Sequence, residues 1–225
     1  MHIEPGIVHG AKMALAYGTA AGAAGLTLRA AWRLVAAEGL AALALRSTIA
    51  AVAVLAFFQL LPHTQAGISE VHFIFGTSLL LILGAAPAAI GLAAGLLVQG
   101  LAFAPADLAM YAVNVTTLLL PLFAMAELAR RSIPAGRAYV DLGYLDVLKL
   151  SAAYQGGVVA WVAFWAFYGQ GLGAGVPAGV ASFALGYWIV LAVEPLVDLA
   201  LLALAKALSG RLSRPLVAPR LLQAA

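Results

Sequence analysis

Residues 76–103 are GTSLLLILGAAPAAIGLAAGLLVQGLAF, a stretch without a single Asp, Glu, Lys or Arg. An α-helix needs about 20 mostly apolar residues to cross a hydrocarbon core of roughly 30 Å. Together with the residues just before it, this stretch predicts two short membrane helices, over 71–86 and 88–103, that meet around Pro87. Their shortness indicates that they are tilted or partly re-entrant.

The rest of the chain is similarly apolar. Hydrophobic residues make up 64% of the 225 residues and charged residues only 9%, so we expect one compact membrane unit. The apolar stretches predict seven helices, over residues 10–32, 47–62, 71–86, 88–103, 107–130, 145–169 and 176–208. The expected fold class is an all-α integral membrane protein, a single polytopic domain over residues 1–225 that consists of an N-terminal loop (1–9), a helical bundle (10–208) and a cytoplasmic tail (209–225).

Lys and Arg fall mainly on one side of these expected helices. Cytoplasmic loops of membrane proteins carry the excess of both residue types. If the N-terminus is outside and the C-terminus is cytoplasmic, eleven of the twelve Lys and Arg residues lie on the cytoplasmic side. They are Arg29, Arg33, Arg46, Arg130, Arg131, Arg137, Lys149, Lys206, Arg211, Arg214 and Arg220. The other side has neither, and is made of residues 1–9, 63–70, 104–106 and 170–176. This pattern predicts a multi-pass membrane protein in contact with the lipid bilayer, and we expect its location to be the bacterial cytoplasmic (inner) membrane.

Two other uses of the basic residues are not supported. They form no stripe with interleaved aromatic residues, so no nucleic-acid partner is expected. A cleaved signal peptide needs a basic segment before its apolar core, whereas the first basic residue is Lys12 and the segment before it contains Glu4. We therefore expect the N-terminus to be mature as written, with Met1 retained.

The first residues can form a small chelating peptide. The amine of Met1, the amide nitrogen of His2 and the His2 imidazole can close two fused chelate rings around one cation. Nitrogen donors in a tetragonal arrangement suit Ni²⁺ or Cu²⁺, and imidazole also suits cobalt and zinc. We choose His72 as the source of a fourth nitrogen, and His63 and His9 remain alternatives on the same side. The absence of cysteine excludes thiolate ligands.

Acidic residues are candidate functional groups in two places, the expected outer loops and the last expected helix. Glu4 and Glu70 either raise the local cation concentration at the mouth of such a site or are ordinary loop carboxylates. Glu194 and Asp198 lie four residues apart inside the last expected helix, where carboxylates are costly and commonly functional. Two hypotheses stay open for this pair: ion pairing with Lys149 or Lys206, or a role in partner coupling or cation exit.

Small residues recur at helical spacing in two places. Gly18, Gly22 and Gly25 lie in GTAAGAAG, and Gly91 and Gly95 lie in GLAAG. Such residues allow close approach of helices in lipid. We interpret both as internal packing, in preference to a docking groove for a partner membrane protein.

The chain start resembles that of a known family, the substrate-binding membrane subunits of energy-coupling-factor cobalt and nickel transporters, called CbiM or NikM. Members begin Met-His-Ile, followed by a short acidic stretch and a glycine. Met1, His2, Ile3 and Gly6 occupy those places here. Pro5 stands where the family usually has its acidic residue, with Glu4 one position earlier.

Three further stretches carry the resemblance. EVHFIFGTSLLLILGAAPAAIGLAAGLLVQGL is similar to the family's Val-His-Leu motif and helix pair, with His72 in the place of the third metal-binding residue. DLAMYAVNVTTLLLPL is similar to its asparagine-containing helix, with Asn114 at the first of two asparagines and Thr117 at the second. VEPLVDLALLALAKAL resembles its closing helix, with Glu194 on the matching glutamate.

The resemblance implies a seven-helix subunit whose N-terminal loop enters the bundle from outside and holds Co²⁺ or Ni²⁺ through Met1, His2 and His72. The ion is the transported substrate, and no cofactor is expected. The implied partners are a transmembrane coupling subunit and a pair of cytoplasmic ATPases, with the need for a small accessory membrane subunit left open.

The chain itself is not expected to be an enzyme. It has no GxxxxGK[ST] loop for ATP, no HExxH helix and no GxSxG turn. The alternatives to an energy-coupling-factor subunit are a secondary, proton-coupled metal-ion transporter, in which Glu194 and Asp198 bind the proton, and a membrane scaffold subunit.

Overall fold

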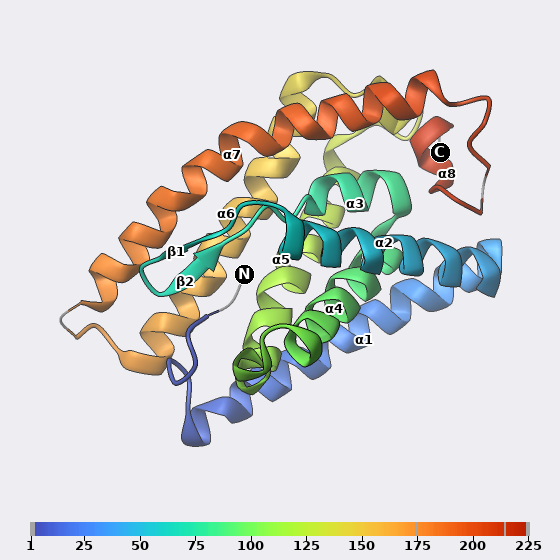
Figure 1. The fold of residues 1–225 in the computed structure, drawn as a ribbon. Helices are drawn as coiled ribbons and strands as arrows, with labels where there is room; N and C mark the ends of the chain where they lie inside the picture. The colour runs from blue at the N-terminus through green and yellow to red at the C-terminus, as the bar shows by residue number, and fades with distance from the viewer. Residues whose placement is uncertain (1–2, 174, 214, 224–225) are drawn as a thin grey trace.

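The structure is a computed structural model that describes residues 3–173, 175–213 and 215–223. It is an all-α membrane protein with one small β-hairpin (Figure 1). The helices and strands of the described residues are α1 (Met13–Glu38), α2 (Leu40–Leu60), β1 (Thr64–Ala66), β2 (Ser69–Val71), α3 (Gly76–Leu83), α4 (Ala85–Ala102), α5 (Tyr111–Ser132), α6 (Tyr144–Gln170), α7 (Val176–Ala207) and α8 (Pro219–Leu222). Three 3-10 turns join them, at Gly10–Lys12, Pro105–Met110 and Tyr139–Asp141.

Five helices of the described residues are long and apolar enough to cross a membrane, which confirms the expected class. They are α2, α4, α5 with the turn before it, α6 and α7. The other two expected spans correspond to α1, which is long but rich in Gly and Thr, and to α3, which has only 8 residues. Figure 1 shows α1 and α7 on opposite sides of the bundle, with α4 and α5 between them.

The connection between α1 and α2 differs from the expectation. The sequence predicts helices over 10–32 and 47–62 with a charged loop between them, but α1 continues to Glu38 and α2 begins at Leu40. Gly39 alone makes the corner, with a φ of +89° that favours glycine. Two of the charged residues expected in that loop pair with each other, because Arg46 contacts Glu38 and also donates to the Pro215 carbonyl.

The third expected span, over 71–86, is also wrong in part. Its first residues belong to an antiparallel hairpin, in which β1 and β2 pair Thr64 with Val71, and only Gly76–Leu83 is helical. The break between α3 and α4 occurs at Gly84, whose φ is +94°, and not at Pro87. Pro87 lies in the first turn of α4, where a missing N–H costs no helical hydrogen bond.

The two small-residue motifs behave differently. A Cβ at Gly91 would lie 2.2 Å from the Ala50 Cβ, and one at Gly95 would lie 2.6 Å from Val54 Cγ1, so α4 packs directly on α2. Internal packing is therefore confirmed for GLAAG. The same interpretation of GTAAGAAG is wrong, because a Cβ at Gly18, Gly22 or Gly25 would meet no atom of the described structure within 4 Å and all three residues are exposed.

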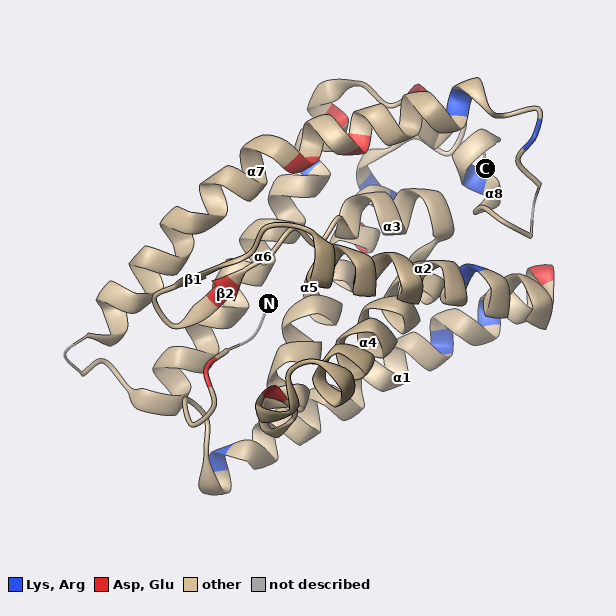
Figure 2. Ribbon diagram, viewed as in Figure 1, with Lys and Arg blue, Asp and Glu red and all other residues tan. Residues whose placement is uncertain are grey.

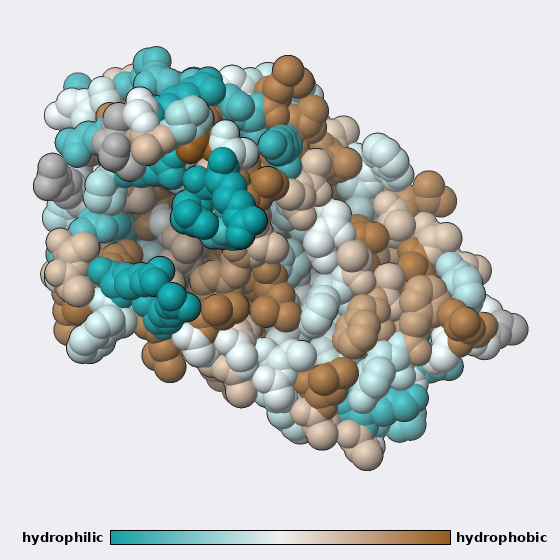
Figure 3. Space-filling view, turned by 180° about the vertical axis from the view of Figure 1, so that it is seen from behind, coloured by the Kyte–Doolittle hydropathy of each residue, from teal (hydrophilic) through white to brown (hydrophobic). Residues whose placement is uncertain are grey.

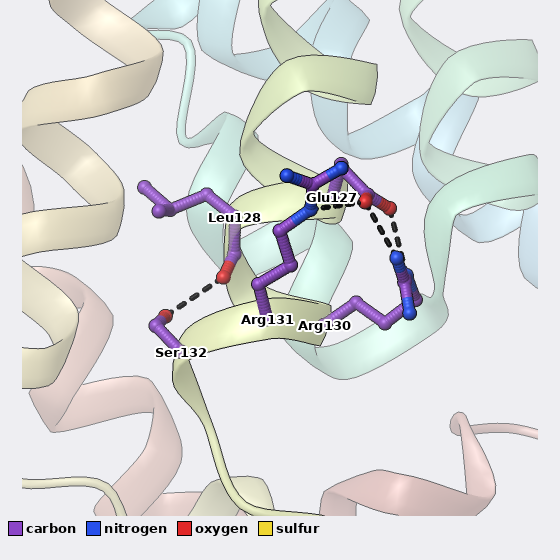
Figure 4. Close-up of polar contacts among 5 residues, drawn as sticks. All are labelled: Glu127, Leu128, Arg130, Arg131 and Ser132. Atoms are coloured by element: carbon purple, nitrogen blue, oxygen red, sulfur yellow. Dashed lines mark hydrogen bonds and ion pairs between the residues drawn. The ribbon is translucent and has the colours of Figure 1, made fainter.

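Charge is distributed unevenly along the bundle. Figure 2 shows Lys and Arg on α1, on α2 and near the C-terminus, gathered towards the end of the molecule that carries α8. At the C-terminal end of α5, Glu127 accepts hydrogen bonds from Arg130 and Arg131, and Ser132 Oγ donates to the Leu128 carbonyl at 2.7 Å (Figure 4). Most of the hydrophilic surface in Figure 3 lies at the same end. This is the distribution that the orientation with a cytoplasmic C-terminus predicts.

Candidate metal-binding site at the N-terminal segment

The N-terminal segment is docked into the bundle. Ile3 is fully buried, its backbone N–H donates to Asn114 Oδ1 at 3.0 Å, and it forms an isolated antiparallel bridge with Ser69. The next residue continues the contact, since the Glu4 N–H donates to the Ile68 carbonyl at 3.3 Å. The chain start therefore extends the edge of the hairpin and reaches α5. Met1 and His2, the first two expected ligands, lie outside the described residues.

A second contact fixes the segment against α6. Ile7 and Val8 are buried, and the Ile7 carbonyl lies so close to Gly169 that a Cβ on that glycine would be 2.1 Å from the carbonyl oxygen. Lys12 Nζ, further along the same segment, donates to the Gly169 carbonyl at 2.8 Å. The absence of a side chain at Gly169 is thus what allows the segment to lie in this position.

His72, the third expected ligand, immediately follows β2. Its side chain is 1% exposed, and Nε2 lies 2.8 Å from Glu70 Oε2. Burial lowers the pKa of the His72 imidazole to about 4, against the opposing effect of the Glu70 carboxylate. The ring is therefore neutral at pH 7, and a neutral imidazole is the form that binds a metal ion.

The structure brings His63 and Glu70 to His72 and leaves His9 elsewhere. The His63 and His72 rings stack with centroids 4.9 Å apart and planes 13° from parallel. Both rings line a cavity of about 200 Å³ whose far wall is α7, through Gly186, Ile189 and Val190. His9 is exposed ahead of the turn that starts α1.

Glu194 does not pair with a lysine. Its Oε1 accepts hydrogen bonds from the backbone N–H groups of Ile74 at 2.7 Å and Phe75 at 3.0 Å, and its Oε2 accepts one from Gln155 Nε2. Phe75 has a φ of +52°, an uncommon conformation for a bulky residue. The carboxylate thus holds a strained turn three residues after His72 and ties it to α7.

Asp198 also differs from the lysine-pairing hypothesis. It is fully buried, and its Oδ1 accepts a hydrogen bond from Ser78 Oγ of α3. Lys206 pairs with Asp141 at 2.6 Å, two turns of α7 further on. Ion pairing of Glu194 or Asp198 with Lys149 or Lys206 is therefore wrong for the described structure.

Sequence reasoning missed two of these partners, Ser78 and Gln155. In the sequence, Ser78 and Gln155 are recognisable only as polar residues within otherwise apolar stretches. That pattern does not predict which groups they contact. The strained turn at Ile74 and Phe75 had no signal, because its hydrogen-bond acceptor lies about 120 residues away in sequence.

The arrangement joins imidazole and carboxylate groups at the end of the bundle opposite α8. Among the described residues, no three His, Asp or Glu side chains form a complete ligand cluster for a metal ion. They provide one buried neutral imidazole, with a second imidazole and a carboxylate beside it, and a docked segment that starts at Ile3.

Comparison with known proteins gives one match. The family model of CbiM, the cobalt uptake substrate-specific transmembrane region, matches residues 2–212. No curated protein and no solved structure matches the chain.

Proposed function

The chain belongs to the CbiM family, a membrane component of cobalt uptake, and from this premise we propose that it is the subunit that captures the transported ion from outside. The proposed ligands are the Met1 amine, the His2 amide nitrogen and imidazole, and the His72 imidazole. Four nitrogen donors of this kind suit Co²⁺ or Ni²⁺.

One observation carries this assignment. Ile3 is anchored to Asn114 and Ser69, and Ser69 precedes His72 by three residues in the same hairpin segment. A chain start anchored there has its amine and second residue within reach of the His72 side of the bundle, because consecutive Cα atoms are only about 3.8 Å apart. Glu70 and His63 support the proposal as outer groups: a carboxylate beside a ligating imidazole orients the ring.

Adding one alanine before Met1 tests the terminal chelate. We expect Co²⁺ binding by the detergent-purified chain to weaken by about tenfold or more, because the new amine lies one residue further from the His2 amide nitrogen and no longer closes a chelate ring with it, although the imidazoles remain. Equilibrium dialysis of Co²⁺ against the native and extended chains measures this. The matched control adds one alanine after Ala225, and equal affinities of native and N-terminally extended chains would contradict the proposal.

Asn114→Ala is expected to weaken Co²⁺ binding by about tenfold, within the range found for residues that position metal ligands. The substitution removes the acceptor of the Ile3 N–H and leaves that donor buried without its partner. Thr117→Val is the matched control one turn away, because Thr117 is buried and, within the part of the chain that the structure describes, its hydroxyl bonds to the Val113 carbonyl of its own helix alone. Isothermal titration with Co²⁺ compares them, and equal losses in both variants would assign the effect to α5 as a whole.

The choice between cobalt and nickel is part of the proposal. The family match favours cobalt as the physiological ion. Intrinsic affinity of nitrogen ligands rises from Co²⁺ to Ni²⁺, so the isolated chain is expected to bind both ions, and selection in the cell depends on geometry and metal supply.

We assign the energy for transport to other chains: a transmembrane coupling subunit and a pair of cytoplasmic ATPases, with a small accessory membrane subunit as a further candidate. The sequence has no ATP-binding loop of its own. Co²⁺ uptake into vesicles that contain the chain and these partners is expected to stop when ATP is withheld and to continue with a protonophore. The opposite result would favour a proton-coupled secondary transporter, and uptake indifferent to the chain would favour a scaffold.

A further inference from the structure

One face of α7 leads inward from the His72 cavity. Gly186 and Val190 line that cavity, and Glu194 and Asp198 continue the same series at intervals of four residues. Residues four apart lie on the same side of a helix, about 6 Å apart along its axis. Asp198 therefore lies roughly 12 Å beyond Val190 along this face, towards the end where Lys206 pairs with Asp141.

Three buried oxygen atoms on α6 and α7 have no hydrogen-bond partner in the described structure. They are Asp198 Oδ2, Gln155 Oε1 and Ser151 Oγ. Their residues are at most 2% exposed. Gln155 contacts the Glu194 carboxylate directly, because its Nε2 donates to Glu194 Oε2.

The register of two antiparallel helices places Ser151 at the same level. Gln155 of α6 lies opposite Glu194 of α7, and Asp141 just before α6 lies opposite Lys206. One turn back along α6 from Gln155 and one turn forward along α7 from Glu194 therefore reach Ser151 and Asp198 at one level of the bundle. Ser78 of α3 closes the third side through its bond to Asp198 Oδ1.

The charge of this cluster is not balanced by a basic side chain. Among the described residues, neither Glu194 nor Asp198 forms an ion pair with Lys, Arg or His. Carboxylates inside a membrane span are costly, and they commonly mark ion pathways. Carboxylate, amide and hydroxyl oxygens are ligands for hard divalent cations, and two carboxylates match the charge of one such ion.

We propose that Asp198 Oδ2, Gln155 Oε1 and Ser151 Oγ form a second, inner binding site for a divalent cation, between the His72 site and the cytoplasmic end of the bundle. The proposal rests on the proposed function and extends it, since it gives the captured ion an intermediate binding site within the membrane. An all-oxygen site binds Co²⁺ more weakly than four nitrogens do. Weak binding at an inner position is what permits release.

The test uses Co²⁺ alone and the full chain in detergent. We expect the native chain to bind one ion tightly and a second weakly, with a dissociation constant on the order of 10⁻⁴ to 10⁻³ M, as for weak oxygen-ligand sites. His72→Ala should keep the weak site while its tight site is weakened by more than about 100-fold, and the double variant His72→Ala, Asp198→Asn should lose the weak site as well. The matched control is His72→Ala, Asp141→Asn, which removes the same charge from the exposed end of the α6 and α7 interface and should retain the weak site.

The outcomes separate this proposal from the proposed function. No tight binding by the native chain would overturn the proposed function. Tight binding by the native chain without any weak site in His72→Ala would overturn the inner site alone, as would equal loss of the weak site in both double variants. Asp198→Asn by itself must keep the tight site; loss of that site would assign Asp198 to the fold and would also overturn the inner site.

Discussion

Replacing His72 with alanine is expected to weaken tight Co²⁺ binding by more than about 100-fold, because loss of a ligand exceeds the 10- to 100-fold cost of losing a residue that only positions one. The imidazole is buried and neutral, so it can bind the ion without first losing a proton. No described histidine replaces it at the end of β2, since His63 is exposed and His9 lies ahead of α1. Equilibrium dialysis of the purified variant measures the change.

His63→Ala is the matched control, because it removes the same ring from the other half of the stacked pair. We expect less than about tenfold weaker binding, as for a group outside the ligand set. Unfolding temperatures of both variants distinguish loss of a ligand from loss of the fold. Equal affinities of His72→Ala and the native chain would remove His72 from the site, and a larger effect of His63→Ala would exchange their roles.

Gly169→Ala is expected to displace the N-terminal segment without touching any proposed ligand. The new Cβ would lie 2.1 Å from the Ile7 oxygen and 2.9 Å from the Ile7 carbonyl carbon, so backbone atoms must move. Overpacking of this kind costs about 1–3 kcal/mol, which is a factor of about 5 to 150 in Co²⁺ affinity if the docked segment bears all of it. Titration calorimetry with Co²⁺ measures the loss.

Gly156→Ala is its control on the same helix. A Cβ at Gly156 meets nothing within 4 Å, and alanine favours the helix by up to about 1 kcal/mol. We expect unchanged Co²⁺ binding and an unchanged or higher unfolding temperature. If Gly169→Ala bound Co²⁺ as tightly as Gly156→Ala, docking of Ile7 on α6 would have no part in the site.

Hydropathy was sufficient for the class of the protein and insufficient for its turns. The apolar stretches of α4, α5, α6 and α7 were located within a few residues, because the membrane demands length and apolar composition and both are visible in a sequence. The corner at Gly39 was missed because Arg33, Glu38 and Arg46 looked like a loop. Two of these charges are instead satisfied by contact with each other, because Glu38 pairs with Arg46, which also donates to the Pro215 carbonyl far along the chain.

For the candidate site too, the sequence predicted some residues but not the contacts that hold them. His72 and Asn114 were identifiable through the resemblance, and the structure places Asn114 on the chain start. The partners of Glu194 and Asp198 were not identifiable, because a buried carboxylate can be satisfied by a lysine, a backbone turn or an amide. Only the register between α3, α6 and α7 decides among these, and that register depends on packing that has no local sequence signal.

Glu194 also couples the position of α7 to the affinity of the proposed site for its ion. Its carboxylate holds the turn at Ile74 and Phe75, so we expect a rotation of α7 that breaks those hydrogen bonds to change the free energy of ion binding at the proposed His72 site as well. Thermodynamic linkage makes the effect reciprocal. If rotation of α7 weakens ion binding by a certain free energy, ion binding disfavours the rotated state by the same free energy. A partner that pulls on α7 would therefore do work against the bound ion.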